Sequence, residues 1–200
     1  MEQIIKRIKE LAESGRLSVI GIDGLGGAGK STLSEKLAEK LNAEGYQTIL
    51  LHIDDFIHER AVRYSDACPE WECYYDLQWR YGHFREVTEK LRRGESAETV
   101  LYDKENDSFF TENVTPSDNA VVLTEGIFLQ RPELDGVFDL MIYIDVSQEE
   151  RLARALRRDT YIGGEDEIER KYRVRYFPAE EHYVRECRPA ERADIVIKGE

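Results

Sequence analysis

A glycine-rich segment constrains this 200-residue chain more than any other feature, because residues 24–31 read Gly-Leu-Gly-Gly-Ala-Gly-Lys-Ser. This is the G-x-x-x-x-G-K-S pattern, in which backbone N–H groups cradle phosphate oxygens. The apolar, β-branched segment 17–22 precedes it, and residues 32–41 follow it with apolar side chains at helical spacing. A strand, a glycine loop and a helix in this order predict a P-loop whose helix begins near Lys30. A glycine-rich turn that merely precedes a lysine would need neither the strand nor the helix.

This motif, a Walker A sequence, predicts how ATP would be held. We expect Lys30 to reach the β- and γ-phosphates and the hydroxyl of Ser31 to bind Mg²⁺. Glycines and main-chain N–H groups would supply the remaining phosphate contacts. The residues predicted to bind the nucleotide are Gly24, Gly26, Gly27, Ala28, Gly29, Lys30, Ser31 and Thr32.

Composition and charge narrow the class of protein. The chain carries 41 acidic and 28 basic residues and a net charge of −13, which argues against general nucleic-acid binding. No stretch is apolar over the length that a membrane span needs, and residues 1–8 lack the apolar core of a signal peptide. The three cysteines, Cys68, Cys73 and Cys187, have no metal-ligand spacing and predict reduced thiols in a cytoplasmic protein.

Short apolar strands alternate with helical segments along the chain, as in a parallel sheet with helices on its faces. After the strand at 17–22, further strands are predicted at 47–53, 120–124, 140–144 and 193–197. Helices are predicted at 2–14 with Gly15 as the stop, at 32–41 before Gly45, at 77–93, at 149–158 and up to about 187. Between them lie an irregular aromatic region at 56–82, a hairpin or extended excursion at 99–115 and a polar loop at 161–167. We predict an α/β fold, with one P-loop NTPase-type domain over 1–200 and a doubly wound parallel β-sheet flanked by helices.

Acidic side chains follow three of these strands, at the edge where ligands bind in such sheets. Asp54 and Asp55 end the second strand, next to the P-loop in the usual strand order, and a carboxylate there can take the proton of an acceptor hydroxyl. Glu125 follows a later strand, at the position where an acid orients Mg²⁺ directly or through water. Asp54 is therefore a candidate catalytic base and Glu125 a candidate metal ligand. The structural alternative for each is a helix cap or a solvated turn.

An arginine-rich helix follows the strand that ends at Asp145. Arg151, Arg154 and Arg158 share one face at helical spacing. They either pair with neighbouring glutamates as a solvated face or neutralise the transferred phosphoryl group. We predict the second role for Arg154 or Arg158, and substrate contact for Arg151. The glycines at 163–164 suggest a hinge for a helical lid at about 159–168 that excludes water.

The aromatic region has two interpretations, and it begins the acceptor-binding region predicted at about 56–115. Its Tyr and Trp side chains either pack as a satellite core or line a pocket for a flat ring or a sugar. Arg60, Arg63 and Arg80 in the same region keep open an acceptor that is already phosphorylated.

In this order, the motifs resemble those of the uridine kinase and phosphoribulokinase family of P-loop kinases, over about residues 17–197. The segments that carry the resemblance are 21–32, 52–56, 74–76, 102–103, 121–127, 151–159 and 193–197. The resemblance implies that Asp54 is the base on an acceptor 5′-hydroxyl and that Glu125 is the magnesium-associated acid. It also implies nucleoside contacts for Asp76 and Tyr102, and positions near the phosphates and the lid for Arg154 and Arg158.

The chain departs from the pattern of the family's nucleoside kinases at four places. Ile57 stands where a Tyr is usual, residues 76–78 read Asp-Leu-Gln instead of Asp-His-Pro, and Asp107 is nearest to the position of an expected His. The lid reads Tyr-Ile-Gly-Gly-Glu at 161–165 instead of Glu-Arg-Gly-Arg. These departures affect the groups expected to recognise a pyrimidine more than those expected to perform the transfer.

The leading hypothesis is an ATP- and Mg²⁺-dependent kinase that phosphorylates a small hydroxylated metabolite, first a pyrimidine nucleoside such as uridine or cytidine. Pantothenate, nicotinamide riboside and a sugar phosphate are alternative acceptors. A regulatory or non-catalytic nucleotide-binding protein is the alternative class, although the Asn-Lys-x-Asp signature of GTP-binding switches is absent. Expected partners are the acceptor and a second copy in a homo-oligomer, as is frequent in the family, with no nucleic acid and no membrane.

Overall fold

The computed structural model describes residues 1–13 and 16–199 and confirms the α/β fold with a parallel sheet. The sheet has the order β2-β5-β1-β6-β7, and all four pairings are parallel. Its strands are β1 (Ser18–Gly24), β2 (Gln47–His52), β5 (Ala120–Gly126), β6 (Leu140–Asp145) and β7 (Ile195–Lys198). Every residue of β1 and β5 is buried, because helices cover both faces of the sheet.

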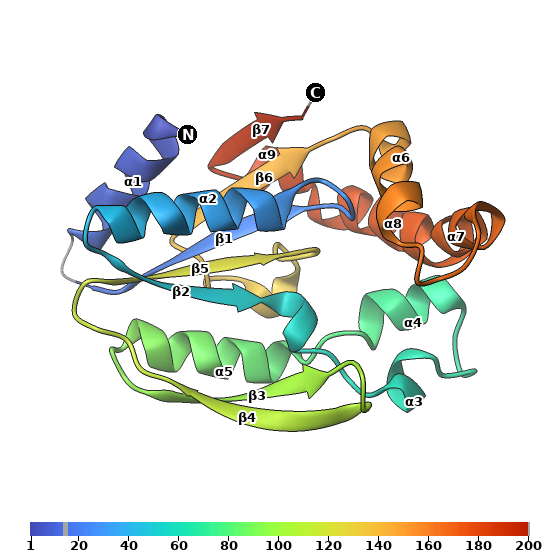
Figure 1. Ribbon diagram of the computed structural model, residues 1–200, viewed down its shortest axis with the longest axis horizontal. Coiled ribbons are helices and arrows are strands. Elements are labelled where there is room, and N and C mark those ends of the chain that lie inside the picture. The colour runs from blue at the N-terminus through green and yellow to red at the C-terminus, as the bar shows by residue number, and fades with distance from the viewer. Residues whose placement is uncertain (14–15, 200) are drawn as a thin grey trace.

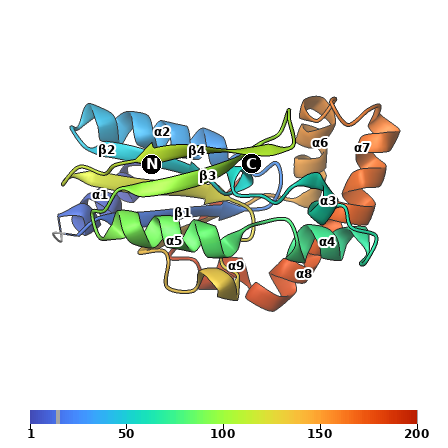
Figure 2. The same ribbon diagram turned by 90° about the horizontal axis from the view of Figure 1, so that it is seen from below.

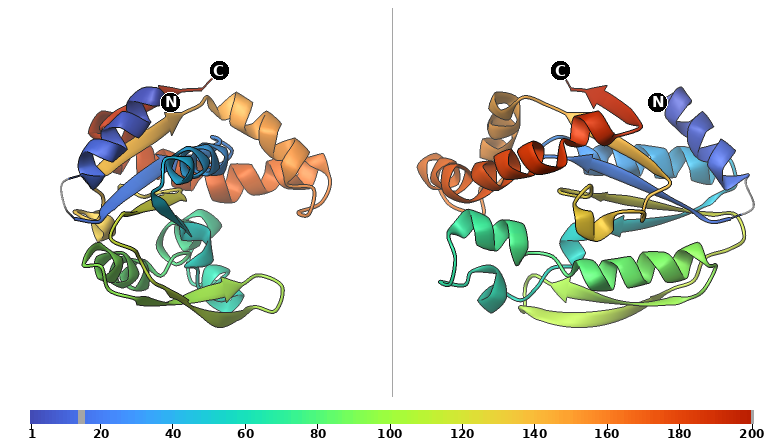
Figure 3. Two further views of the ribbon diagram at one scale, coloured as in Figure 1. Left: turned by 60° about the vertical axis from the view of Figure 1, so that its left-hand side comes forward. Right: turned by 180° about the vertical axis from the view of Figure 1, so that it is seen from behind.

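Two apolar layers make the sheet doubly wound, as predicted. On one face, α1 (Glu2–Ala12) and α2 (Lys30–Ala43) pack against alternate side chains of β1 and β5. On the other face, α5 (Tyr81–Arg92) and α8 (Phe177–Cys187) pack against the remaining ones. In Figure 1 α2 lies in front of the sheet, and Figure 2, seen from below, shows α2 on one side of the strands and α5 and α8 on the other. The right-hand view of Figure 3 shows α8 from behind. The predicted stop of the first helix at Gly15 lies outside the described residues.

The predicted hairpin is also confirmed. Strands β3 (Ala97–Asp103) and β4 (Ser108–Val114) pair antiparallel and form a separate two-stranded sheet. The hairpin lies beside α5, away from α1 and α2 (Figure 1). It brings Tyr102 to the end of the molecule where the main strands finish.

The region predicted to be irregular at 56–82 instead contains a 3₁₀ turn and two short helices. These are η1 (Ile53–Asp55), α3 (Arg60–Arg63) and α4 (Glu70–Asp76). The helix predicted to begin at Leu77 begins at Tyr81, so that prediction was wrong by one turn. The reason is a local pairing, since Ile57 bridges Trp79 and the N–H of Arg80 donates to the carbonyl of Phe56 at 2.7 Å.

The lid predicted at about 159–168 falls in the C-terminal part of the chain, on a loop and the start of the helix that follows it. Helix α6 (Gln148–Arg158) is followed by a loop and by α7 (Glu165–Lys171), a π-helical turn η3 (Tyr172–Tyr176) and α8. The π turn precedes Pro178, whose missing N–H disrupts the regular α-helical bonding of that turn. The short segments η2 (Pro132–Leu134) and α9 (Pro189–Arg192) complete the chain. In the described part of the chain, no helix has the length and apolar character to cross a membrane.

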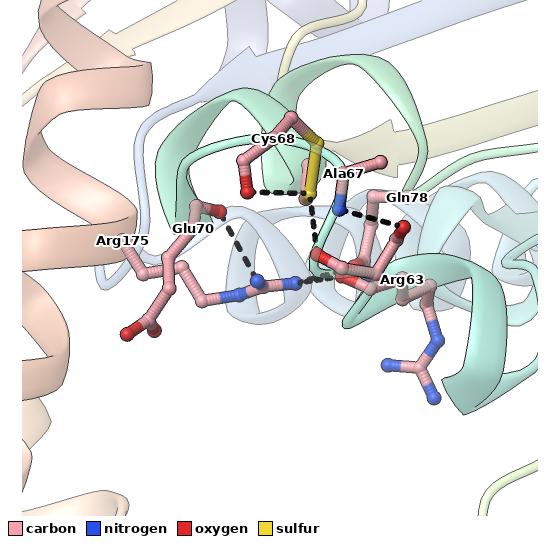
Figure 4. The surroundings of a disulfide bond; sticks show 8 residues. Arg63, Ala67, Cys68, Glu70, Gln78 and Arg175 are labelled. Carbon is pink, nitrogen blue, oxygen red and sulfur yellow. Dashed lines mark hydrogen bonds between the residues drawn. A yellow bond between two sulfur atoms is a disulfide. The ribbon is translucent and has the colours of Figure 1, made fainter.

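The prediction of reduced thiols was wrong for two of the three cysteines. Cys68 and Cys73 form a disulfide, whereas Cys187 is free and buried. The loop between α3 and α4 turns at Pro69, which caps α4, and this turn brings the two Cα atoms to 5.8 Å. This spacing is within the range that a disulfide requires. Figure 4 shows the bond beside Arg175 and the carbonyl of Glu70.

Candidate active site

A cavity of about 640 Å³ opens where the strands end, between the P-loop, α3 and the lid helices at the right of Figure 1. Ligands of parallel α/β sheets bind at this edge. Eight of the predicted site residues line the cavity: Gly26, Gly27, Lys30, Ser31, Asp54, Tyr102, Glu125 and Arg158. Seven others are absent from the lining: Gly24, Ala28, Gly29, Thr32, Asp76, Arg151 and Arg154. The catalytic and nucleotide roles of the first group stay predictions, but the fold brings these residues together as expected.

The P-loop adopts the backbone that its glycines permit. Gly27 and Gly29 have φ values of +79° and +95°, which side chains disfavour. A Cβ on Gly27 would also lie 3.1 Å from the carbonyl oxygen of Arg151. Helix α2 begins at Lys30, as predicted, and the Nζ atom of Lys30 donates to the carbonyl of Leu25 at 3.1 Å. The helix N-terminus and the lysine thus meet at the cavity, an arrangement that favours a bound anion.

A buried ion pair supports the P-loop from behind. Arg151 donates through Nη1 to Oε2 of Glu180 at 2.7 Å and to the carbonyl of Gly26 at 3.1 Å, and both charged side chains are 3% exposed. The N–H of Gly26 donates to the other oxygen of Glu180 at 2.9 Å. Burial raises the pKa of Glu180, and Arg151 opposes that shift. Arg151 therefore fixes the loop, and the structure does not place it against substrate as predicted.

Three side chains converge beside the first turn of α2. Ser31 Oγ donates to Oε1 of Glu125 at 3.1 Å, and His52 Nδ1 lies 2.7 Å from the same oxygen. Burial opposes ionisation of Glu125, but the hydrogen bond with His52 and the charge of Lys30 hold its pKa below the ordinary value. The same hydrogen bond raises the pKa of His52. A hydroxyl and an ionised carboxylate are hard oxygen donors and fit Mg²⁺, which takes few protein ligands beside phosphates and water.

Asp54 is the member of the acidic pair that lines the cavity. Trp79 Nε1 donates to its Oδ1 at 3.3 Å and so orients the carboxylate. Asp55 lies outside the lining and forms an ion pair with Lys104 at 3.8 Å. The prediction that the strand before Asp54 lies next to the P-loop strand was wrong, because β5 separates β2 from β1. Glu125 therefore stands between Asp54 and the P-loop, an order suited to an acceptor on one side of the metal-binding acid and a nucleotide on the other.

The two arginines predicted near the phosphates occupy different positions. Arg154 donates to the carbonyl of Gly27 at 3.1 Å and pairs with Glu150, as the structural alternative for this helix proposed. Arg158 lines the cavity, and its Nε donates to the buried carboxylate of Asp159 at 2.6 Å. Tyr172 of η3 donates to the same carboxylate at 2.7 Å. Asp159 thus connects Arg158, at the end of α6, to η3.

Tyr102 lines the part of the cavity that was predicted to bind the acceptor. Its hydroxyl accepts from Nη2 of Arg63 at 2.8 Å and donates to Asp107 at 2.6 Å. Asp76, the other predicted nucleoside contact, lies away from the cavity, is exposed and pairs with Arg131 at 3.3 Å. Several aromatics do line the cavity: Tyr64, Tyr74, Tyr161, Tyr172 and Tyr176. Others pack in the core, among them Tyr75 and Trp79 against Phe128, so both interpretations of the aromatic region hold in part.

Sequence reasoning missed several residues that shape the site. Glu180, Arg175, Lys171 and Gln78 line the cavity, and His52 contacts Glu125. Only His52 had a local signal, since it precedes the predicted acidic pair by two residues. Glu180 is 154 residues away from Gly26, its partner, and no pattern in the sequence joins them.

The fold and the site define a P-loop kinase: a parallel sheet, a glycine loop ending in Lys-Ser, and acidic side chains at neighbouring strand ends. The family model described as "Phosphoribulokinase / Uridine kinase family" matches residues 19–199, and the chain belongs to this family.

Individual relatives agree with this assignment. The uridine kinase of Bacillus pumilus is 28% identical over 183 residues, covering 90% of this chain and 85% of the relative. The structure titled as a possible uridine kinase from Bacillus stearothermophilus is 32% identical, with a TM-score of 0.75, and covers 98% of this chain and 99% of that one. A putative fructose transport system kinase from Silicibacter is similar in fold, at 20% identity with a TM-score of 0.75, and covers 96% of this chain and 98% of its own. The uridine kinase-like protein 3 of Arabidopsis thaliana is 28% identical over 169 residues, which are 80% of this chain but about a third (34%) of that relative's length.

Proposed function

We propose that this protein transfers the γ-phosphoryl group of ATP, with Mg²⁺, to a hydroxyl of a small metabolite. The observation that carries the proposal is the single cavity edge shared by Lys30, Ser31, Glu125 and Asp54. Phosphoryl transfer needs a phosphate cradle, cations and a group that takes the acceptor proton, and these four side chains supply that set. The names of the relatives support a kinase, and the acidic overall charge does not favour a nucleic-acid substrate.

In the proposed reaction each side chain has one task. Lys30 and the N-terminus of α2 hold the phosphates, while Arg158 stabilises charge on the transferred group from the lid side. The hydroxyl oxygen of the acceptor attacks the γ-phosphorus, and ADP leaves. The carboxylate of Asp54 accepts the proton of that hydroxyl. Ser31 and Glu125 would hold Mg²⁺, which neutralises phosphate charge when bound. The Asp159–Tyr172 contact keeps the lid over Arg158 and excludes water, which would otherwise compete as the acceptor.

The acceptor is the finer part of the proposal. The relatives' names make uridine and cytidine the first nucleosides to test. The alternatives of pantothenate, nicotinamide riboside and a sugar phosphate differ from them in charge. The cavity carries Tyr102, for which the family resemblance implies nucleoside contact, and Arg63 donates to its hydroxyl. The charge of the acceptor is therefore the property that the test must vary.

The test measures ADP release by the full chain with ATP and Mg²⁺ against a panel of nucleosides, vitamins and sugar phosphates. We expect acceptor-dependent release, and we expect Asp54→Asn to lower kcat about 10²- to 10⁴-fold while ATP binding persists. Asp55→Asn is the matched control, since Asp55 lies outside the cavity lining, and it should retain most of the activity. Unchanged kcat in Asp54→Asn would overturn the role of Asp54, and ADP release without dependence on any acceptor would overturn the kinase proposal.

A further inference from the structure

The half of the cavity opposite the P-loop is strongly basic, although the chain as a whole is acidic. We define the cationic wall as the five lysine and arginine side chains that line this half: Arg60, Arg63, Lys104, Lys171 and Arg175. They come from α3, the β3–β4 turn, α7 and η3, and so from segments more than 100 residues apart in the sequence. A net charge of −13 makes such a gathering of positive charge unexpected without an anionic ligand.

Two members of the wall are buried guanidinium groups. Arg63 is 7% exposed and Arg175 is 1% exposed. Among residues 1–13 and 16–199, no carboxylate oxygen lies within 4.0 Å of either guanidinium. Arginine is rarely buried without an acidic partner, because a desolvated charge costs several kcal/mol unless it is compensated.

The hydrogen bonds of Arg175 go to neutral acceptors only. Its Nη1 donates to the carbonyl of Glu70 at 3.1 Å, and its Nη2 donates to the carbonyl of Arg63 at 3.0 Å and to Oε1 of Gln78 at 3.3 Å (Figure 4). Its Nε is buried and has no hydrogen-bond partner in the described part of the chain. Three of the five N–H donors of the guanidinium thus hold it in a fixed orientation, and two, on Nη1 and Nε, remain without a partner in the described residues.

Arg63 is held in the same way, and it also lies near the ring of Tyr64. Its Nε donates to the carbonyl of His58 at 2.5 Å and its Nη2 donates to the hydroxyl of Tyr102. The ring of Tyr64 lies 5.5 Å from the guanidinium carbon of Arg63, 4.2 Å from that of Arg175 and 5.8 Å from Nζ of Lys171. Three cations thus surround one exposed aromatic ring at the cavity surface.

The acidic side chains that line the cavity do not neutralise this wall. Glu180 is paired with Arg151, Asp159 with Arg158, and Glu125 with His52. Asp54 is the remaining acid of the lining, and the proposed function assigns it to the acceptor hydroxyl. Lys30 and Arg158 already serve the phosphates of the nucleotide, so the charge of the cationic wall is in excess of what ATP needs.

We propose that the acceptor carries an oxyanion, a phosphate monoester or a carboxylate, in addition to the hydroxyl that is phosphorylated, and that Arg63 and Arg175 bind this oxyanion. This inference rests on the proposed kinase function and deepens it. The planar fork of a guanidinium matches an O–P–O or O–C–O edge. Arg60 and Lys171 add charge at the rim, and Lys104, paired with Asp55, contributes less. Gln78, one of the departures from the nucleoside kinase pattern, then helps to orient Arg175 and has no need to contact a base.

The first test measures binding without catalysis. Full-length protein is saturated with Mg²⁺ and a non-hydrolysable ATP analogue, which fills the P-loop, and inorganic phosphate is then titrated calorimetrically. We expect one phosphate to bind, and Arg175→Gln or Arg63→Gln to weaken it about 10- to 100-fold, the effect of losing a charged hydrogen bond. Arg173→Gln is the matched control, since Arg173 lies in the same π turn but pairs with Glu169 at 3.1 Å outside the cavity.

Because Arg175 is fully buried, its variant could fail to fold, and Arg60→Gln keeps the test decisive. Arg60 is exposed and its guanidinium donates to the exposed carbonyl of Lys104, so its replacement should leave the core intact and weaken phosphate binding severalfold. Absence of phosphate binding in the analogue-loaded protein, or equal binding in wild type and all three cavity variants, would overturn the inference.

The second test measures transfer to acceptors that differ in charge. D-ribose 5-phosphate is compared with D-ribose, and D-glycerate with glycerol, while uridine serves as the neutral nucleoside. We expect kcat/KM to favour one anionic member of a pair at least tenfold, and Arg63→Gln to remove that preference through KM. A phosphate preference and a carboxylate preference identify the source of the oxyanion. Efficient transfer to uridine without activity on any anionic acceptor would overturn the inference but leave the kinase function intact.

Discussion

The P-loop side of the cavity and the cationic wall are both proposed to bind oxyanions, but they are built in different ways. The P-loop side uses main-chain N–H groups and a few side chains from three short segments, at residues 24–31, 52–54 and 125. The cationic wall uses side chains alone, gathered from positions 60 to 175. A main-chain site changes little when side chains vary, whereas a side-chain site can change its ligand by single substitutions. The comparison suggests that the transfer chemistry is general to the fold and that the wall is particular to the acceptor.

The largest expected effect comes from removing the lysine of the P-loop. Lys30→Ala should lower kcat/KM for ATP about 10²- to 10³-fold, because a fixed charge on the transferred phosphates is lost. Lys36→Ala, on the exposed side of the same helix, should change it little. Phosphate binding at the cationic wall, measured separately, should persist in Lys30→Ala if the two sides are independent. An unchanged kcat/KM would remove the P-loop assignment itself.

Breaking the buried pair behind the P-loop should act mainly on stability. Arg151→Met leaves Glu180 buried and unpaired, which costs about 3–5 kcal/mol of unfolding free energy. The double variant with Glu180→Met should recover a large part of this loss, because two apolar side chains can replace a buried ion pair. Urea unfolding of the wild type, both single variants and the double variant gives the cycle. A single variant as stable as the wild type would show that the pair does not support the loop.

The same comparison explains how much of the molecule could be predicted from sequence. The sheet, Lys30, Ser31, Asp54 and Glu125 were predictable, because strand ends and the glycine loop are local patterns that the fold brings to one edge. Arg175 and Glu180 were not, because each acts on a partner more than 100 residues away. The sequence also does not reveal which charged side chains are buried. Arg151 was therefore predicted to contact substrate, whereas it is buried against Glu180.

The errors at α4, α5 and the cysteines have one physical origin. The apolar residues after Leu77 do have helical spacing. Because Ile57 pairs with Trp79, however, the helix begins at Tyr81, one turn later than predicted. The disulfide depends on a turn between α3 and α4 that was predicted as irregular chain. Tertiary contacts overrode a local preference in the first case and created a local structure in the second.

The pH dependence of kcat/KM should report on Glu125, whereas that of phosphate binding should report on the cationic wall. Glu125 must be ionised to bind Mg²⁺, and His52 helps to keep its pKa low. In His52→Asn the positive charge is lost, so the acid limb of the kcat/KM profile should move to higher pH. Phosphate binding at the wall should keep its pH dependence, because His52 does not line the cavity. His182→Asn, on α8, is the control, and an acid limb that stays in place in His52→Asn would contradict the coupling.

The pKa shifts of Glu125 and His52 also predict how the stability of the fold depends on pH. The lowered pKa of Glu125 stabilises the fold above its unfolded value of 4.5, and this contribution is lost as the pH falls through the folded value. The raised pKa of His52 stabilises the fold below 6.5, and this contribution is lost as the pH rises through the folded value. The pair therefore contributes most between pH 4.5 and 6.5, and the stability difference between wild type and His52→Asn should be largest there.

The smallest expected effect lies at the disulfide and bears on the cationic wall alone. The Cys68–Cys73 loop contains Glu70, whose carbonyl accepts from Arg175, so the bond restrains one of the neutral acceptors that orient the guanidinium (Figure 4). Replacing both cysteines by serine should raise KM for the acceptor roughly two- to tenfold, since one neutral hydrogen bond contributes about 0.5–1.5 kcal/mol. KM for ATP should not change, because Lys30 donates to Leu25 and the glycine loop is held by Arg151 and Glu180, none of which belongs to the 68–73 loop. A parallel rise in both constants would show that the two sides of the cavity are mechanically coupled, and the distinction between a general phosphate cradle and a particular acceptor wall would then fail.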